Sequence, residues 1–175
     1  NGISFHINSG ETLALVGESG CGKTVSALSI LRLLQEPPAE LLSGKIIFDG
    51  QDLLSLNAKA LQNLRGRSIS MIFQDPMTSL NPVLTVGEQI AETLLRHTTM
   101  NRQEALQKSA DLLGRVELLS PKEKLGFYPH QLSGGMRQRV MIAMALACSP
   151  RILIADEPTT ALDVLIQAQI LDLLE

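Results

Sequence analysis

The chain has 175 residues, of which 45% are hydrophobic and 19% are charged, and its formal net charge is −3. This composition is that of one globular domain with a buried core, and the absence of a dense Lys/Arg run disfavours a nucleic-acid binder. The two cysteines lie far apart and do not suggest a disulfide framework or a zinc site, and no apolar stretch approaches the roughly 18 residues of a membrane-spanning helix.

The first part of the chain predicts short strands around one helix. Apolar residues alternate with polar ones over residues 3–7, and residues 12–16 form a short apolar run, so both segments are typical of strands. A glycine-rich loop follows, and a helix is predicted over residues 23–34. Residues 45–48 predict another strand, which the turn dipeptide Asp49-Gly50 closes.

The middle of the chain predicts helices inserted between strands. A strand is expected over residues 69–73, and patterns typical of capping boxes then begin at Thr85, Asn101 and Ser120. Three helix starts in so short a span indicate a helical subdomain, inserted at about residues 83–135.

The last part returns to the strand–helix alternation. Ser133 is placed to cap a long helix that ends before Pro150, and residues 152–155 are an apolar run typical of a central parallel strand. Asp163 is expected to begin a final amphipathic helix. The alternation predicts an α/β fold with a largely parallel core.

The glycine-rich loop has the G-x-x-x-x-G-K-[ST] pattern of a phosphate-binding loop. Its residues are Gly17, Glu18, Ser19, Gly20, Cys21, Gly22, Lys23 and Thr24. In such a loop the glycines let backbone N–H groups turn toward phosphate oxygens, the Lys23 ammonium reaches the β- and γ-phosphates, and the Thr24 hydroxyl ligates Mg²⁺. The alternative is a plain glycine turn followed by a chance Lys-Thr pair, which the predicted strand–loop–helix context disfavours.

Two carboxylates follow the predicted strand at residues 152–155. Because open α/β sheets bind ligands at the carboxyl ends of their strands, Asp156 is suited to holding Mg²⁺ and Glu157 to acting as a general base on water. A strand end solvated by two acids is the alternative, and it is common. Together with the phosphate loop, the pair favours nucleotide hydrolysis.

A third motif carries a resemblance to a known family. Residues 132–139, Leu-Ser-Gly-Gly-Met-Arg-Gln-Arg, resemble the signature motif of ABC ATPases and lie shortly before the Asp-Glu strand, as in that family. Ser133, Gly134 and Gly135 at a helix N-terminus would also form an anion site, although an isolated Ser-Gly-Gly is often a simple helix cap. Gln74 resembles the Q-loop glutamine, which contacts Mg²⁺, and Asp163 resembles the D-loop aspartate, which lies near a partner's phosphate loop.

The resemblance implies a fold and a mechanism. The fold is a P-loop NTPase core with an ABC-type helical subdomain and a partial antiparallel β-subdomain, and the cofactors are ATP and Mg²⁺. Two such domains would pair head to tail, with ATP between residues 17–24 of one and residues 133–135 of the other. The pair would lie at the cytoplasmic face of the membrane, held there by permease subunits that a solute-binding protein serves. No nucleic-acid partner is expected.

Longer stretches narrow the resemblance further. Residues 71–82, 128–136 and 155–164 are similar to the ATPase subunits of dipeptide and oligopeptide importers, although nickel and glutathione importers carry similar stretches. A soluble ABC ATPase outside transport is disfavoured, because the region from Val83 to Gln131 is short and has no sustained heptads. A module that binds ATP without hydrolysing it is disfavoured by the carboxylate at Glu157.

The ends of the chain indicate a fragment. The chain opens within a predicted strand and stops without a helix-stop signal, so we expect truncation at both ends. In the family, an aromatic residue that stacks on adenine would precede Asn1, and a histidine near the γ-phosphate would follow Glu175.

Overall fold

The structure, a computed structural model, describes residues 2–34, 43–159 and 164–174. Two compact units make up the chain. Unit 1 comprises Asn1–Gln62 with Glu175, and unit 2 comprises Asn63–Leu174. Helix α2 (Ala58–Leu64) carries the chain from the first unit into the second. No helix of the described ranges is long and apolar enough to cross a membrane.

The described residues of unit 1 form one helix and one hairpin besides α2. Helix α1 (Lys23–Ile30) follows the glycine-rich loop, and β1 (Ile47–Phe48) pairs antiparallel with β2 (Gln51–Asp52). Asp49 and Gly50 connect the two strands with φ values of 51° and 74°. These angles are typical of a type I′ turn, whose twist matches that of the flanking strands. The predicted turn at Asp49-Gly50 is therefore confirmed.

The strands predicted over residues 3–7 and 12–16 do not form. Within the described part of unit 1, residues 2–16 run as extended chain with a turn in which Glu11 N–H donates to Asn8 O. A strand requires a ladder partner, and no partner strand is present for these residues in the part of the chain that the structure describes. Their apolar side chains remain exposed, Val16 at 93%. Alternation alone therefore predicted the wrong state here.

Helix α1 is shorter than predicted because its end is closed by backbone bonds. Arg32 adopts a left-handed conformation with φ of 49°. Its N–H donates to Ser29 O at 3.0 Å, and Leu33 N–H donates to Leu28 O at 2.9 Å. This pair of bonds is a Schellman motif, which ends a helix by satisfying its last carbonyls. The helix therefore stops at Ile30 rather than at Leu34.

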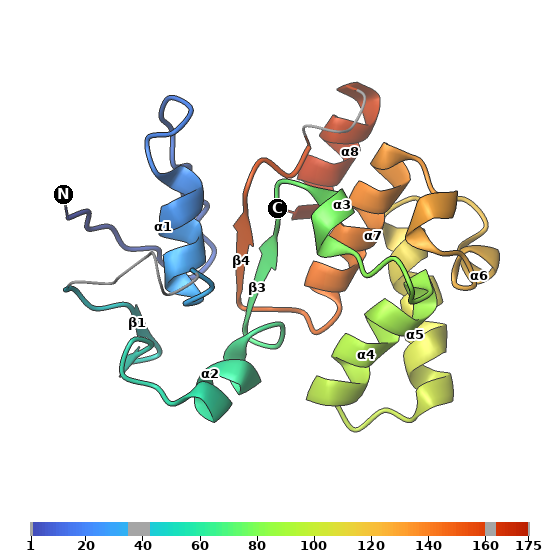
Figure 1. The fold of residues 1–175 in the computed structure, drawn as a ribbon, viewed down its shortest axis with the longest axis horizontal. Helices are drawn as coiled ribbons and strands as arrows, with labels where there is room; N and C mark the ends of the chain where they lie inside the picture. Colours follow the sequence, from blue (N-terminus) through green and yellow to red (C-terminus); the bar gives the residue numbers. More distant parts are fainter. Residues whose placement is uncertain (1, 35–42, 160–163, 175) are drawn as a thin grey trace. The chain divides into compact units, whose positions relative to one another are not determined.

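Unit 2 contains a parallel strand pair joined by a long helical connection. Strand β3 (Ile69–Ile72) pairs in parallel with β4 (Ile152–Ala155), in a register that places Ile69 opposite Ile152 and Ile72 opposite Ala155. The two strands lie side by side in Figure 1. All four residues of β3 are buried, as expected for a central strand. The strands predicted over residues 69–73 and 152–155 are confirmed, and so is the parallel character expected of the second.

The connection between β3 and β4 is built from short and medium helices. They are α3 (Pro76–Ser79), α4 (Val86–His97), α5 (Arg102–Arg115), α6 (Pro121–Lys124), the 3-10 turn η1 (Pro129–Gln131) and α7 (Gly134–Leu146). Helix α8 (Val164–Leu174) follows β4. Asp163, predicted to begin this last helix, lies outside the described residues.

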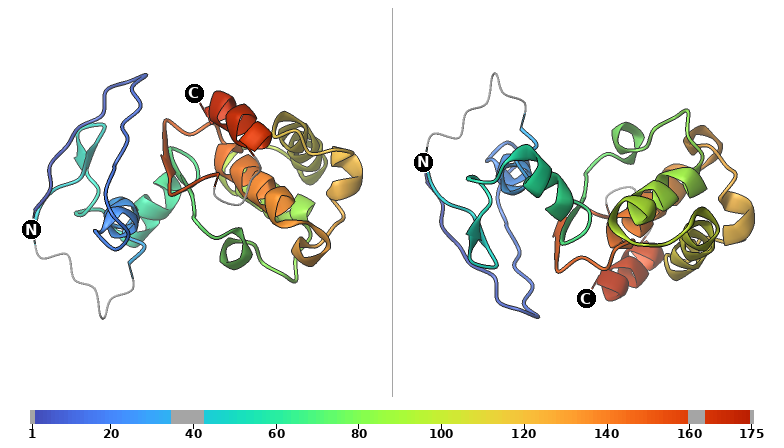
Figure 2. Two further views of the ribbon diagram at one scale, coloured as in Figure 1. Left: turned by 90° about the horizontal axis from the view of Figure 1, so that it is seen from above. Right: turned by 90° about the horizontal axis from the view of Figure 1, so that it is seen from below.

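Helix α7 is at the centre of unit 2. It contacts α3, α4, α5 and β3, and the views of Figure 2 show it among the other helices of this unit. Its side chains Val140, Ile142 and Ala143 are fully buried. Because one helix meets four other elements, the packing of unit 2 depends on the buried face of α7.

The predicted helix caps have different outcomes. Thr85 and Asn101 each form a reciprocal capping box, and the Ser133 hydroxyl accepts the Met136 N–H at 3.3 Å at the start of α7. The capping box predicted at Ser120 is wrong. Ser120 has φ of 55° and makes no side-chain cap bond, and α6 begins instead with Pro121, whose ring presets a helical φ without requiring a cap.

Candidate functional site

The phosphate-loop candidate in unit 1 is closed by its own lysine. Lys23 Nζ donates to Gly17 O at 2.8 Å and to Glu18 O at 2.9 Å, and Cys21 N–H donates to Glu18 O at 3.3 Å. The lysine ammonium therefore lies over the loop that it follows in sequence. An ammonium held by two carbonyls on an exposed loop can exchange them for phosphate oxygens, which are stronger acceptors.

Glycines shape this loop in two ways. Gly20 and Gly22 have φ of 80° and 104°, a region that side chains disfavour. At Gly17, an added Cβ would lie 2.5 Å from Cys21 Sγ, so a side chain there would displace the cysteine. The loop therefore requires glycine at these positions for its path. Ser19, Cys21 and Thr24 are exposed, which leaves the Thr24 hydroxyl accessible to a ligand.

A second group of predicted residues gathers at the carboxyl edge of the strand pair in unit 2. Asp156 follows β4 and is only 8% exposed, and its N–H donates to Ile72 O at 3.0 Å, which extends the parallel ladder by one residue. Gln74 Nε2 donates to Glu157 Oε2 at 3.0 Å. Three residues from two strand ends thus meet at one edge, although 83 positions separate Gln74 from Glu157.

The backbone at Glu157 is in an unusual conformation. Its φ is 49°, a left-handed value that costs free energy for a residue with a β-carbon. Pro158 follows, and its carbonyl accepts a hydrogen bond from Gln138 Nε2 at 2.6 Å. The turn after β4 is therefore held by helix α7 as well as by the strand that precedes it.

The predicted anion site at the start of α7 is open to solvent. Ser133 and Gly134 are exposed and Gly135 is half-buried, and a Cβ added at Gly134 would meet no atom within 4 Å. The backbone N–H groups of a first helical turn have no partner within their helix, and the helix dipole is positive at that end. Arg137 Nε donates to Pro129 O at 2.7 Å and fixes α7 to the preceding turn.

Sequence reasoning missed the role of Gln138, which it treated as one letter of the motif at residues 132–139. Gln138 is fully buried and lies on the apolar face of α7, one turn before Ile142. The helical periodicity of the sequence places Gln138 among apolar residues, and this placement could have drawn attention to it. A buried carboxamide requires a partner, and the sequence does not show that Pro158 provides it.

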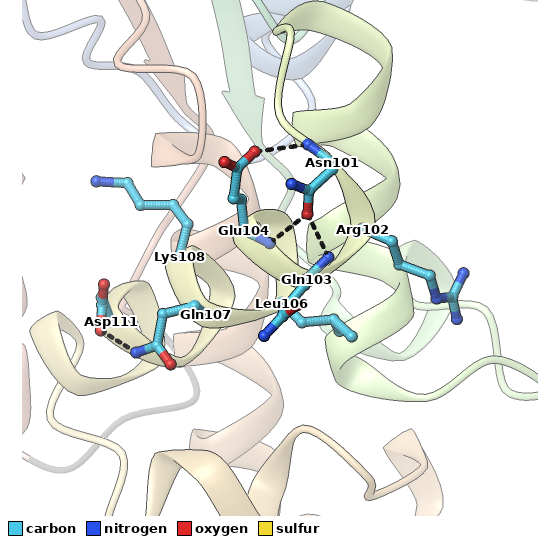
Figure 3. A pocket seen from close by; sticks show the side chains of 8 residues that line it. All are labelled: Asn101, Arg102, Gln103, Glu104, Leu106, Gln107, Lys108 and Asp111. Atoms are coloured by element: carbon cyan, nitrogen blue, oxygen red, sulfur yellow. Dashed lines mark hydrogen bonds between the residues drawn. The ribbon is translucent and has the colours of Figure 1, made fainter.

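Other features do not add a site. Asp163, predicted as the D-loop aspartate, lies outside the described residues. A hollow of about 930 Å³ runs along α5 from Asn101 to Asp111, but the residues that line it come from this helix and its N-cap alone (Figure 3). Among the residues that the structure describes, no group of three His, Cys, Asp or Glu side chains could hold a metal.

Comparison with known sequences gives consistent matches. The family model described as "ABC transporter" matches residues 1–160. The chain is 60% identical over 173 residues to the "Probable peptide ABC transporter ATP-binding protein" of Sinorhizobium fredii, covering 99% of this chain and 52% of that protein. It is 57% identical over 172 residues to the "Dipeptide transport ATP-binding protein" of Bacillus subtilis, covering 98% and 51%.

Comparison with solved structures agrees with the sequence matches. The ATP-binding cassette MJ0796, solved as a dimer in a post-hydrolysis state bound to ADP and Pi, is 32% identical and superposes with a TM-score of 0.86. The match covers 97% of this chain and 70% of that one. This likeness confirms the predicted α/β fold class. The chain spans about half the length of the curated relatives it matches.

Proposed function

The chain belongs to the ABC transporter family, and from this premise we propose that it binds and hydrolyses Mg-ATP to power the import of peptides through a membrane permease. The observation that carries the proposal is the meeting of Gln74, Asp156 and Glu157 at the carboxyl edge of β3 and β4. Two relatives named as peptide and dipeptide transport ATP-binding proteins support the choice of solute.

Phosphate binding is proposed for the loop from Gly17 to Thr24. The left-handed glycines and the close approach at Gly17 leave a tight backbone turn, and the Lys23 ammonium already faces oxygen acceptors. The N-terminus of α1 adds a positive dipole end to the same loop. Exchange of the two carbonyls for β- and γ-phosphate oxygens would place the lysine charge against the charge of the nucleotide.

The residues present fit a magnesium ion. Mg²⁺ prefers oxygen ligands, and in unit 2 Asp156 and Gln74 would supply a carboxylate and an amide carbonyl. The family resemblance adds the hydroxyl of Thr24 in unit 1 as a further ligand. When bound, the ion neutralises negative charge that develops on the phosphates. The buried position of Asp156 suits it to holding a cation, because little bulk water reaches its carboxylate to compete for the ion.

Glu157 is proposed as the general base. Its carboxylate is exposed at the strand edge, and Gln74 fixes one of its oxygens by a hydrogen bond of 3.0 Å. This carboxylate can accept a proton from an attacking water. General-base assistance of this kind contributes about 10²–10⁴ in rate.

The remaining elements are assigned roles at interfaces. We assign Ser133, Gly134 and Gly135 to the γ-phosphate of a nucleotide held by a second ATPase domain, in a head-to-tail dimer, and Asp163 to the same dimer interface. The α4–α5 region belongs to a helical subdomain at about residues 83–135. Permease subunits would hold the dimer at the cytoplasmic face of the membrane, and a solute-binding protein would deliver the solute to them.

The proposal is tested by transport. The complete polypeptide that carries this sequence is reconstituted in vesicles with candidate permease subunits and a candidate solute-binding protein from the same organism. The expected result is ATP-dependent uptake of labelled di- and oligopeptides, lost in Lys23→Ala. Uptake of nickel or glutathione in place of peptides would replace the solute assignment, and ATP turnover without any uptake would reject the coupling to transport.

A further inference from the structure

Gln138 is a polar side chain at a fully buried position of α7. Its exposed fraction is 0%, and it lies on the face that also buries Met141, Ile142 and Ala145. Its Nε2 donates to Pro158 O at 2.6 Å, across 20 positions of sequence. Its Oε1 is buried and has no hydrogen-bond partner among the described residues.

A side chain in this state costs stability rather than adding to it. A buried acceptor without a partner loses its bonds to water and gains none in return. A methionine or leucine would fill the same volume at an apolar position without that cost. The presence of a carboxamide at this position is therefore explained by its Nε2 donor, which binds the Pro158 carbonyl.

Pro158 is the residue through which the conformation of Glu157 can be fixed. Proline has no N–H, so its carbonyl is the one backbone group at that position that can take a hydrogen bond. The residue before it, Glu157, has φ of 49°, and such a conformation persists only where the surroundings hold it. Gln138 holds the backbone on one side of Glu157, and Gln74 holds its carboxylate on the other.

We propose that Gln138 is a positioning residue, which keeps the Glu157 carboxylate at its reactive place by anchoring the turn after β4 to helix α7. The inference rests on the proposed function, since it assumes that Glu157 acts on water. It also connects the motif at residues 132–139 with the Asp-Glu pair after β4, because Ser133 is the N-cap of the helix that carries Gln138. A shift of α7 would then change the position of Glu157.

The test replaces Gln138 with methionine in the complete polypeptide and measures steady-state ATP hydrolysis together with thermal unfolding. Methionine keeps the volume and removes both the donor and the unpartnered Oε1. We expect kcat to fall at least about tenfold, because small displacements of a reacting group have large effects on rate. KM for Mg-ATP and Tm should change little, since the phosphate loop is untouched and one buried acceptor is removed.

Gln89→Met is the matched control. Gln89 on α4 is also buried, at 5% exposure, but its amide is fully bonded: Nε2 donates to Asn81 O and Leu84 O, and Oε1 accepts the Asn81 N–H. The same substitution there should lower Tm more than Gln138→Met does and leave kcat unchanged. The two variants thus separate a loss of stability from a loss of positioning.

A second comparison uses the Glu157→Gln background. If Gln138 acts through Glu157, adding Gln138→Met should not lower the residual turnover further, because residues that act as one unit are not additive. Should Gln138→Met misfold, Gln138→Asn keeps an amide but is one methylene too short to reach Pro158, and it should show the same fall in kcat.

The outcomes are distinct. Wild-type hydrolysis with unchanged kcat in Gln138→Met and Gln138→Asn would overturn the inference while leaving the proposed function intact. A further fall of turnover in the Glu157→Gln background would also overturn it. Absence of hydrolysis in the wild-type polypeptide would reject the proposed function itself.

Discussion

The loop around Lys23 and the strand edge around Glu157 are held by different kinds of contact. The loop is fixed by bonds between neighbours in sequence, from Lys23 to Gly17 and Glu18, at most 6 positions away. The edge is fixed by bonds from Gln74 and Gln138, which lie 83 and 20 positions from their acceptors. The proposed phosphate loop therefore forms from local sequence, whereas the strand edge depends on the packing of unit 2.

The two units also differ in how many apolar side chains they bury. Among the described residues, the buried apolar side chains of unit 1 are Ala27, Leu31, Leu53 and Leu61, whereas most of the buried apolar side chains, Val140 and Ile142 among them, lie in unit 2. Apolar burial is the main favourable term in folding. We therefore expect unit 2 to govern global stability and the loop of unit 1 to respond mainly to ligands.

The largest expected effect is the loss of ATP turnover when Glu157, the proposed base at the strand edge, is replaced. Glu157→Gln keeps the shape of the side chain and can still accept the Gln74 hydrogen bond, but an amide cannot take a proton from water. Turnover should fall by about 10²–10⁴ while ATP binding persists. Steady-state phosphate release and nucleotide titration measure the two quantities.

The control for this change is Glu92→Gln. Glu92 is an exposed glutamate on α4, and its replacement should leave turnover as in the wild type. Near-normal phosphate release by Glu157→Gln would remove Glu157 from the role of base.

The packing difference is tested by truncating one apolar side chain in each unit. Ile142→Ala removes a fully buried side chain from α7 and should cost about 2–5 kcal/mol of unfolding free energy, because the cavity cannot close completely. Val16→Ala removes a side chain that is 93% exposed and should leave the denaturation midpoint within error. Denaturant titration of both variants checks the pair. Equal destabilisation would mean that Val16 is buried in the folded protein.

The ligand response of unit 1 is tested at Lys23. In the wild type, ATP at a hundredfold excess over its Kd should add about 2.7 kcal/mol of stability. Lys23→Ala should abolish this gain, because it removes the charge that meets the phosphates. Lys59→Ala, at an exposed position on α2 of the same unit, should retain it. A thermal-shift titration in which both variants respond to ATP alike would reject the phosphate-loop assignment.

The contrast between the units also explains what the sequence could predict. The family prediction was confirmed, because its motifs are short and consist of residues whose chemistry is local. The turn at Asp49-Gly50 and the caps at Thr85, Asn101 and Ser133 were confirmed for the same reason. The strand at residues 152–155 was confirmed because its continuous apolar run is typical of a central parallel strand, although its partner β3 lies far away in sequence. The roles of the individual site residues stay predictions.

Features that depend on distant partners were not predictable. Residues 3–7 alternate as a strand does and residues 12–16 form an apolar run, but neither pattern provides a neighbouring strand to pair with. Ser120 fits a capping pattern, but its backbone is left-handed and its side chain makes no capping hydrogen bond. The bond from Gln138 to Pro158 follows from the placement of α7 against the turn after β4, which no local pattern specifies.

The two cysteines give the smallest expected effect, and they report on the two units separately. Cys21 is exposed in the phosphate loop, and Cys148 is half-buried at the end of α7, with its thiol 3.8 Å from Thr93 O. Burial raises the pKa of the Cys148 thiol, and the positive charge of Arg67 offsets this only in part. Because the thiolate is the reactive form, a raised pKa leaves less of it at neutral pH.

Maleimide should therefore label Cys21 several times faster than Cys148 at neutral pH. With rising pH, labelling of Cys148 should continue to increase beyond the range in which an ordinary thiol is already fully ionised. Saturating Mg-ATP should slow the labelling of Cys21, since the proposed phosphate site surrounds it, and leave Cys148 unchanged. Mass spectrometry of time points with and without nucleotide measures both rates. Protection of both cysteines by ATP would show that nucleotide binding also tightens the core of unit 2, and equal rates without any protection would contradict the placement of Cys21 in the phosphate loop.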